Sequence, residues 1–481
     1  MRVDLLHRLK KEFTEDFKLI IKVSNHLRKA GFEAYIVGGA VRDLVLNRHP
    51  KDFDLATNAT PEQIQKVKGL EKAVYPDTAQ AYGVTRLKID GSELEIATFR
   101  KDIDPHLGRK QTKVEFVTLD EDLLRRDFTV NALAIDPISG KLVDHVGGLE
   151  DIKSELIRFI GDPNARIQED PLRLLRAIRF KNSLDFEYED ETTQAIIDAV
   201  KNGMVNDIAT DRLRIELSRM LVHQSRVNAL KDLDKFGILK LVLPEVTAGK
   251  GVEQPPQFHA EGDVWTHQLL AMDALPPYPS RQLAWATLLH DIGKPATLSL
   301  PKNKSDRIHF DKHYSIGADM AKQILSRLKF SKKEIENIMW MIHYHLSIDD
   351  LPNMTRSHQI KMLSHPAFSD LFELHKADAT ASWSKGRRQQ TPDFPVLEEL
   401  WQDYQSKSPE ERVPSLKRDL GIDGNWLLKE FGKEFDLKSN ARLGELLKQL
   451  EEIYKNQGIS DKKYYRDKAK QLLDASFKLK S

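Results

Sequence analysis

The sequence predicts a fold of the α+β class, in which an N-terminal α/β head with a mixed sheet precedes an elongated all-helical body. Between residues 34 and 136, short β-rich or alternating segments such as AYIVGG, GVTRLKI, ELEIATF, VEFVTL and VNALAID are separated by polar turns and helical stretches. From about residue 150, apolar residues recur at helical spacing, as in PLRLLRAIRF and DRLRIELSRML. At 481 residues the chain is too long for one ordinary core, so several domains are expected.

Changes in composition predict where these domains begin and end. We expect an N-terminal helix over 1–28, the head over 29–147 and a helical neck and body over 148–250. The stretch TAGKGVEQPPQFHAEGD has the Gly and Pro content of a linker, and a histidine-rich helical domain over 262–385 follows it. SKGRRQQTPDFP marks a second break before a charged helical tail over 395–481.

Composition excludes several classes of protein. The chain has no cysteine, which rules out disulfides, thiolate metal sites and a cysteine nucleophile. No segment approaches the roughly 20 apolar residues that span a bilayer, and the N-terminus lacks the apolar run of a signal peptide. We therefore expect a cytoplasmic protein with no membrane partner. Lys plus Arg number 74 and Asp plus Glu number 73, so any nucleic-acid binding must come from local basic patches and not from net charge. The sequence does not predict the oligomeric state.

Two acidic residues follow a glycine-rich turn in GGAVRDLVLNRHPKDFDLAT. If Asp52 and Asp54 lie in a strand, they point to the same face and repel each other unless cations are bound. Such a pair suits two divalent ions about 4 Å apart, and hard oxygen ligands favour Mg²⁺. Glu95, in an alternating segment, is either a third carboxylate of this site or a surface residue of its strand.

The turn before the two aspartates has features of a phosphate site. Gly38 and Gly39 allow close approach of the backbone to a ligand, and the next segment has a helical pattern whose N-terminus attracts phosphate. Arg42, in its first turn, could fork onto phosphate oxygens. The alternative is that the glycines form an ordinary loop and that D-F-D is a turn.

These motifs, in order, resemble a known family. GGAVRD with DFD, LLRRDFTVNALA, GGLEDI and EDPLRLLRAIRF are similar to the ordered motifs of class II tRNA nucleotidyltransferases, the family of CCA-adding enzymes and bacterial poly(A) polymerases. The resemblance implies Mg²⁺-dependent, template-independent transfer of C, C and A from CTP and ATP to tRNA 3′ ends. It also implies that Arg126 contacts the triphosphate and that Asp127 and Asn131 position the sugar.

The chemistry of the bases predicts how such a protein would select them. Cytosine and adenine each present an amino donor beside a ring-nitrogen acceptor, which one carboxylate and one guanidinium can match; guanine and uracil present the reverse and would leave groups unpaired. The resemblance assigns this role to Asp170 and Arg173, although residues at this spacing also form ordinary helical ion pairs. Arg176 and Arg179 recur on the same helix as candidate triphosphate or backbone contacts.

The histidine-rich region contains ligands for a second metal site. His267, His290, Asp291 and Asp378 follow the order H…HD…D, which resembles the HD phosphohydrolase domain. Imidazole and carboxylate ligands without thiolates suit Mn²⁺, Ni²⁺, Fe²⁺ or Mg²⁺. Lys294, His313 and His343 are further candidates, and because His343 and His345 diverge on a helix, at most one should face the site. The domain could hydrolyse phosphate esters or be purely architectural.

The sequence is compatible with several activities. Segment 101–118 matches a flexible loop of family members that add A, which favours full CCA addition or A addition. The alternatives within the family are CC addition, A addition and polyadenylation. The alternatives of another class are an HD phosphohydrolase whose head only binds RNA, and an RNA-binding module without chemistry.

Overall fold

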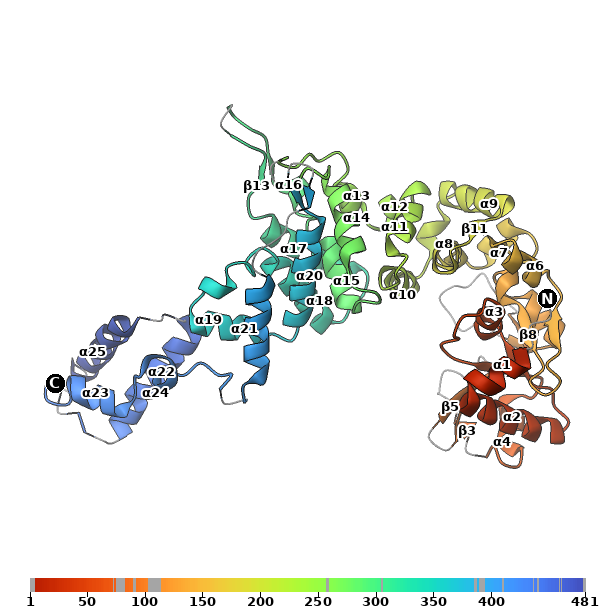
Figure 1. The fold of residues 1–481 in the computed structure, drawn as a ribbon, viewed down its shortest axis with the longest axis horizontal. Coiled ribbons are helices and arrows are strands. Elements are labelled where there is room, and N and C mark those ends of the chain that lie inside the picture. The colour runs from red at the N-terminus through yellow and green to blue at the C-terminus, as the bar shows by residue number, and fades with distance from the viewer. Residues whose placement is uncertain are drawn as a thin grey trace. The chain divides into compact units, whose positions relative to one another are not determined.

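A computed structural model of the chain gives its fold (Figure 1). It describes residues 5–71, 73–74, 83–89, 92–102, 114–256, 259–303, 306–384, 387–388, 394–408, 411–435, 437–438, 441–457, 459 and 461–478. The chain divides into two compact units, residues 1–244 and 245–481. Among the described residues, no helix has both the length and the apolar character needed to cross a membrane.

The first unit is built on a seven-stranded sheet. Its strand order is β3-β4-β5-β2-β1-β8-β9, formed by β1 (Tyr35–Val37), β2 (Asp54–Thr57), β3 (Ala73–Val74), β4 (Val84–Ile89), β5 (Ser92–Thr98), β8 (Leu133–Ile135) and β9 (Leu142–Asp144). Only β2 and β5 pair in parallel, so the sheet is mixed, as predicted. The predicted strand VEFVTL yields β7 (Val114–Phe116), which pairs outside this sheet with β6 (Arg100–Asp102).

Short helices cover the sheet. The N-terminal segment, expected as one helix, forms two. The helices of the head are α1 (Leu5–Glu12), α2 (Thr14–Lys29), α3 (Gly39–Val45), α4 (Pro61–Lys66), α5 (Leu119–Leu124), α6 (Gly148–Lys153) and the single turn η3 (Thr129–Asn131). Helix α3 packs on β1, β8 and η3, and Gly38 N, in the turn before it, donates to the carbonyl of Leu133 in β8 at 3.0 Å.

A helical neck completes the first unit. It contains α7 (Pro163–Glu169), α8 (Leu172–Leu184), α9 (Asp190–Lys201), η4 (Met204–Asp207), α10 (Thr210–Leu221), α11 (Arg226–Lys235), α12 (Ile238–Val242) and the strand pair β10 (Leu156–Ile157) and β11 (Glu187–Tyr188). Leu174, Ala177 and Ile178 bury one face of α8, as its apolar spacing predicts. The opposite face of α8 carries the arginines that form the site described below.

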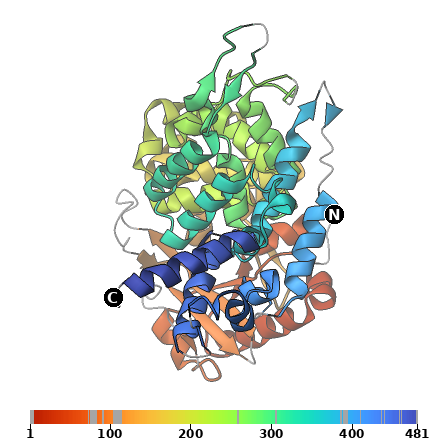
Figure 2. The same cartoon turned by 90° about the vertical axis from the view of Figure 1, so that its left-hand side faces the viewer.

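The second unit is a helical bundle followed by a smaller helical cluster (Figure 2). The bundle contains α13 (Pro244–Thr247), α14 (Val264–Ala274), α15 (Arg281–Leu289), α16 (Lys294–Thr297), α17 (His313–Arg327), α18 (Lys332–Tyr344), η5 (Leu351–Asn353), α19 (Arg356–Leu363), α20 (Phe368–Ala381) and α21 (Phe394–Ser406). Two small hairpins interrupt it: β12 (Leu298–Ser299) with β13 (His309–Phe310), and β14 (Trp383–Ser384) with β15 (Arg387–Arg388).

The C-terminal cluster has its own core. Helices α22 (Leu416–Leu420), α23 (Gly424–Phe431), α24 (Ala441–Gln457) and α25 (Lys462–Lys478) pack around buried side chains that include Leu450, Tyr454 and Tyr465. The architecture therefore confirms the predicted α+β class, with a mixed-sheet head before a helical body. The small strand pairs of the neck and bundle are additions to the predicted all-helical part.

Candidate active site and metal centre

Three carboxylates of the head influence one another at the sheet. Strand β2 begins at Asp54. Asp52 therefore lies just before the strand, whereas the sequence predicted both aspartates within it. Asp54 is in register with Glu95 on the parallel strand β5, so the two side chains leave the sheet on the same face. Glu95 also makes a loose surface contact with Arg86, with 3.6 Å between Oε2 and Nε.

The surroundings of Asp54 disfavour its charged form. Asp54 is accessible to solvent, yet desolvation by its surroundings and the negative charges of Glu95 and Asp52 raise its pKa to about 6, against a lowering effect of Arg126. A carboxylate that repels two others is stabilised in its charged form by a bound cation. The donor set therefore fits a divalent metal with oxygen ligands.

Arg126 lies over the glycine turn. Gly38 has a φ of 74°, and a Cβ built on it would meet Arg126 Nη1 at 2.8 Å. The guanidinium is held there by Asp122, with 3.2 Å between Nη2 and Oδ2, and by the carbonyl of Asn131 at 3.3 Å from Nη1. Gly38 therefore lets the arginine approach the backbone directly beside the carboxylates.

A buried network joins four of the predicted nucleotide-binding residues. Arg42 Nη1 donates to Asn131 Oδ1 at 2.5 Å, and Asn131 Nδ2 donates to Asp127 Oδ1 at 3.1 Å. Arg176 Nε donates to Asp127 Oδ2 at 2.7 Å. Burial disfavours the charge on Asp127, but Arg176 and the surrounding donors outweigh it and hold its pKa below the ordinary value. The network ties the helix after the glycine turn to α8.

The ring of Phe180 packs against one arginine of α3 and two arginines of α8. The guanidinium carbons of Arg42, Arg176 and Arg179 lie 5.3, 5.3 and 4.0 Å from the centre of its buried ring. Arg179 also donates through Nε to the buried Glu216 at 2.6 Å, a partner that the sequence did not indicate. Stacking on an aromatic face limits the freedom of these side chains and fixes the directions of their N–H groups.

The predicted base-reading pair is not assembled in this structure. Asp170 accepts two hydrogen bonds from Arg212 of α10, with distances of 3.0 and 2.7 Å. Arg173 Nη1 instead donates to the carbonyl of Arg166 at 2.7 Å and to Glu169 Oε2 at 2.6 Å. Asp170 and Arg173 do not pair, so the expectation of an ordinary ion pair between them is wrong, and sequence spacing did not reveal Arg212.

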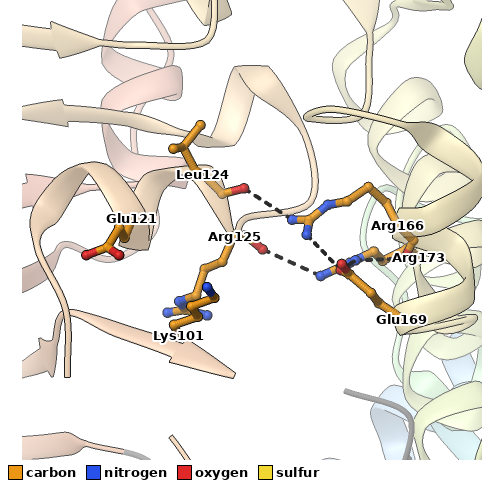
Figure 3. A pocket seen from close by; sticks show the side chains of 7 residues that line it. All are labelled: Lys101, Glu121, Leu124, Arg125, Arg166, Glu169 and Arg173. Atoms are coloured by element: carbon orange, nitrogen blue, oxygen red, sulfur yellow. Dashed lines mark hydrogen bonds and ion pairs between the residues drawn. The ribbon is translucent and has the colours of Figure 1, made fainter. Parts of the chain in front are cut away.

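Arg173 lines a pocket of about 250 Å³ (Figure 3). On one side Arg166 and Arg173 converge on the Glu169 carboxylate, and on the other lie Lys101, Glu121, Leu124 and Arg125. Four of the seven lining side chains are basic and two are acidic, which suits an anionic ligand with a polar edge. Asp170 is not among the lining residues.

All four predicted ligands of the histidine region meet in the interior of the bundle. His267 Nε2 lies 2.9 Å from Asp378 Oδ1 and 3.3 Å from His290 Nε2, and His290 Nε2 lies 3.2 Å from Asp291 Oδ2. Asp291 and Asp378 raise the pKa of His290 to about 10 against the opposing effect of burial. Four imidazole and carboxylate side chains that face one another in this way fit a divalent metal.

A second group adjoins the first. Asp291, His313 and His345 place one ligand atom each within 4.8 Å of one another. The Nε2 atoms of His313 and His345 are buried and make no hydrogen bond within the described part of the chain. Burial and the nearby charge of His290 lower the pKa of His345 to about 3, so its ring is neutral. Unpartnered buried nitrogens facing a carboxylate fit a metal-binding function.

Of the further candidate residues in the histidine region, some lie at the centre and others do not. Lys294 contacts Asp291 Oδ2 at 2.7 Å, which places it at the centre. His343 instead packs against the rings of Tyr314 and Tyr344, so of the two histidines on this turn His345 faces the site. Sequence reasoning missed Glu261, which contacts His267 from the segment interpreted as a linker. Its position in an H-A-E-G-D stretch gives no periodic signal.

Three known families match successive parts of the chain. Residues 34–158 match the poly A polymerase head domain family, residues 185–250 match the family described as the probable RNA and SrmB-binding site of polymerase A, and residues 268–379 match the HD domain family. The curated CCA-adding enzymes of Bacillus pumilus and Bacillus licheniformis are 41% and 35% identical over 46% and 57% of this chain. The alignments cover only 53% and 64% of those relatives.

The fold also matches a solved structure over nearly its whole length. The crystal structure of the Bacillus stearothermophilus CCA-adding enzyme in complex with CTP superposes with a TM-score of 0.63 at 24% identity, covering 96% of this chain and 99% of that one. At this identity the likeness concerns the fold. With the matched families, it shows that the chain has a head similar to the poly A polymerase head domain, a following region similar to the probable RNA-binding site of polymerase A, and a region similar to the HD domain.

Proposed function

We propose that the chain is a CCA-adding tRNA nucleotidyltransferase, which transfers C, C and A from CTP and ATP to tRNA 3′ ends and releases pyrophosphate. One observation carries the proposal: Asp54 lies in register with Glu95 and within the field of Asp52, beside an arginine held over a glycine turn. The relatives named CCA-adding enzymes, aligned over roughly half of their length, support the same reaction class.

The head carboxylates would hold Mg²⁺. Asp52, Asp54 and Glu95 would supply oxygen ligands; burial and the negative charges of Glu95 and Asp52 raise the pKa of Asp54. Bound magnesium supplies stabilisation for the charge that develops on the attacking hydroxyl and on the leaving pyrophosphate. The chain itself supplies positioning: Arg126 faces the triphosphate, while Asn131 and Asp127 hold the sugar.

Selection of C and A would use Asp170 and Arg173. In this structure Arg212 donates to the Asp170 carboxylate, and Arg173 donates to Glu169 and to the carbonyl of Arg166. A base that presents an amino donor beside a ring acceptor can replace Arg212 at the Asp170 carboxylate. Its ring acceptor can likewise replace the oxygen atoms that Arg173 now contacts. Guanine and uracil would leave the carboxylate facing a carbonyl oxygen, at a cost of about 1–3 kcal/mol for each unpaired group.

An extension assay tests the proposal. Purified protein is mixed with a tRNA transcript that lacks its 3′ CCA, and with CTP, ATP or both. We expect addition of three nucleotides, followed by arrest. Unbounded A tails would make the protein a poly(A) polymerase, and arrest after CC, or A addition only to a transcript that ends in CC, would assign a partial activity. Residues 103–113 of the predicted loop over 101–118 lie outside the described residues, so the assay decides between these outcomes.

A specific observation favours a second activity in the HD domain. The buried, unpartnered Nε2 atoms of His313 and His345 adjoin the cluster of His267, His290 and Asp378. We propose that this centre binds divalent metal (Mn²⁺, Ni²⁺, Fe²⁺ or Mg²⁺) and hydrolyses phosphate esters. Loss of incorporation in the Asp52→Ala, Asp54→Ala variant with hydrolysis intact would establish two separate sites. Absence of incorporation by the unaltered protein, with hydrolysis present, would favour the phosphohydrolase alternative. Location in the cytoplasm stays a prediction.

A further inference from the structure

The segment before α14 is pinned against the metal centre of the HD domain. Gly251 N donates to Asp263 Oδ2 at 2.7 Å, and Val264 N donates to the carbonyl of Val252 at 3.1 Å. These bonds close the segment into a loop whose two ends lie together at the start of the helix. From it the side chain of Glu261 enters the interior and is only 1% exposed.

Glu261 contacts two histidines through one oxygen. Its Oε1 accepts from His267 Nδ1 at 2.9 Å and from His259 Nδ1 at 2.8 Å. A carboxylate only accepts hydrogen bonds, so the Nδ1 atoms of both rings carry protons. The His267 ring is thereby fixed with Nδ1 toward Glu261 and Nε2 toward Asp378 and His290. A ring nitrogen turned toward the other candidate ligands is the one available to a metal.

The other histidines of the centre are oriented differently. Their Nδ1 atoms donate to backbone carbonyls three residues earlier: His290 to Thr287, His313 to Phe310 and His345 to Ile342, at 2.8, 2.8 and 2.6 Å. Each of these histidines lies at the start or end of a helix. His267 lies within α14, where carbonyls accept helical hydrogen bonds. Its orientation therefore requires a side-chain acceptor from outside the helix.

We infer that Glu261 is a positioning residue of the HD metal centre, which sets metal affinity by holding His267 in the tautomer that presents Nε2. The inference rests on the proposed metal binding by this centre. The group of His259, Glu261 and His267 could itself be regarded as a set of metal ligands. In this group the Glu261 oxygen accepts from both ring nitrogens, whereas the group on the other side of His267 adjoins the Nε2 atoms of His313 and His345, which make no hydrogen bond among the described residues; we therefore assign Glu261 to the orientation of His267.

The segment supports the centre at a second point. Gln254, which is buried, accepts from Lys294 Nζ at 2.7 Å through Oε1. The same ammonium lies 2.7 Å from Asp291 Oδ2. A loop with the composition of a linker thus contacts His267 directly through Glu261, and it reaches Asp291 through Lys294. Outer partners of this kind commonly alter metal affinity by about 10- to 100-fold when removed.

Titration with Co²⁺ tests the inference. The full chain carries Asp52→Ala and Asp54→Ala, so that the head carboxylates do not contribute, and the visible absorption of bound Co²⁺ reports nitrogen ligation. We expect Glu261→Gln to weaken Co²⁺ binding by about 10- to 100-fold and to change the spectrum, with an unchanged melting temperature of the metal-free protein. The exposed Glu253→Gln, from the same segment, is the matched control and should bind like the parent.

Different outcomes separate the two proposals. Equal affinity and spectrum for Glu261→Gln and the parent would overturn the positioning function while the metal centre stands. Failure of the parent to bind Co²⁺ would overturn both. If Glu261→Gln does not fold, the ring-nitrogen NMR shifts of His267 in the Co²⁺-free and Zn²⁺-loaded parent decide. An Nδ1–H tautomer with Nε2 on the metal supports the inference, and Nδ1 on the metal overturns it.

Discussion

The buried carboxylate of Asp127 contributes both to the stability of the head and to the arrangement of the candidate nucleotide site. One oxygen of this carboxylate accepts a hydrogen bond from Arg176. The other accepts hydrogen bonds from the side chain of Asn131 and from the backbone N–H of Phe128. The same asparagine holds Arg42 beside the glycine turn. Removing the charge on Asp127 would leave Arg176 without this ion pair and loosen the contacts that we expect to position the nucleotide.

We therefore expect Asp127→Asn to lower the free energy of unfolding of the first unit by about 2 kcal/mol. Breaking a buried ion pair costs about 3–5 kcal/mol, and the estimate is reduced because the Arg176 side chain is 30% exposed. Denaturant titration measures the loss. Glu150→Gln, from a pair whose side chains are 71% and 78% exposed, should change stability by less than about 0.5 kcal/mol. Equal effects of the two variants would contradict the account.

The same pair predicts a dependence on pH. The folded-state pKa of Asp127 lies below its ordinary value, so folding favours the charged form. Its contribution is therefore fully present above the unfolded pKa of about 3.9, and it is lost as the pH falls through the folded pKa. The difference in unfolding free energy between the protein and Asp127→Asn should be constant from pH 7 to pH 5 and shrink below about pH 4. A difference that grows on acidification would contradict this assignment.

At the scale of elements, the turn between β1 and α3 couples the sheet to Arg126. Alanine at Gly38 would combine an unfavourable positive φ with a Cβ 2.8 Å from Arg126 Nη1. The matched control is Gly31→Ala, since Gly31 has a φ of 87° and an added Cβ would meet nothing within 4 Å. Both variants should lose about 1 kcal/mol of stability from the backbone alone.

Only Gly38→Ala should impair the site. Displacement of Arg126 weakens the contact expected with the triphosphate, so the KM for CTP and ATP should rise at least tenfold, while Gly31→Ala keeps the parent KM. Steady-state incorporation kinetics measure both values. An unchanged KM in Gly38→Ala would show that Arg126 does not act on the nucleotide.

Close packing of two elements also supports the metal centre. An alanine Cβ at Gly293 would lie 2.2 Å from the carbonyl oxygen of His313 at the start of α17. We expect Gly293→Ala to separate His313 from Asp291 and to abolish Co²⁺ binding by the HD centre, while incorporation by the head persists. Loss of incorporation with metal binding intact would contradict this division.

Elements with strong periodicity could be predicted from the sequence, and their tertiary partners could not. The segments around Ile36, Leu55, Ile96 and Ala134 form strands because alternation and β-branched residues specify buried strands locally. Pairing of Asp170 with Arg212 joins residues 42 positions apart, and no local pattern contains that information. Glu261 was overlooked for the same reason, because its polar, glycine-flanked surroundings are those of a linker.

At the scale of the whole molecule, two sets of candidate ligands occupy two compact units. The carboxylates of the head lie in residues 1–244, and the histidine-rich centre lies in residues 245–481. The order of the motifs predicted this division, since each set falls within one stretch of sequence. The positions of the ligand atoms depended on helix ends and strand registers, which the sequence indicates only to within a few residues.

Metal-dependent nucleotide transfer by the head is the central claim, and incorporation of labelled CMP into a CCA-less tRNA tests it most directly. The account predicts that Asp54→Asn lowers the rate by at least a thousandfold, because the variant keeps the shape of the site and loses the charge that holds the cation. His290→Ala, in the other unit, should keep the rate of the parent. Undiminished incorporation by Asp54→Asn in the presence of Mg²⁺, or equal loss in both variants, would contradict it.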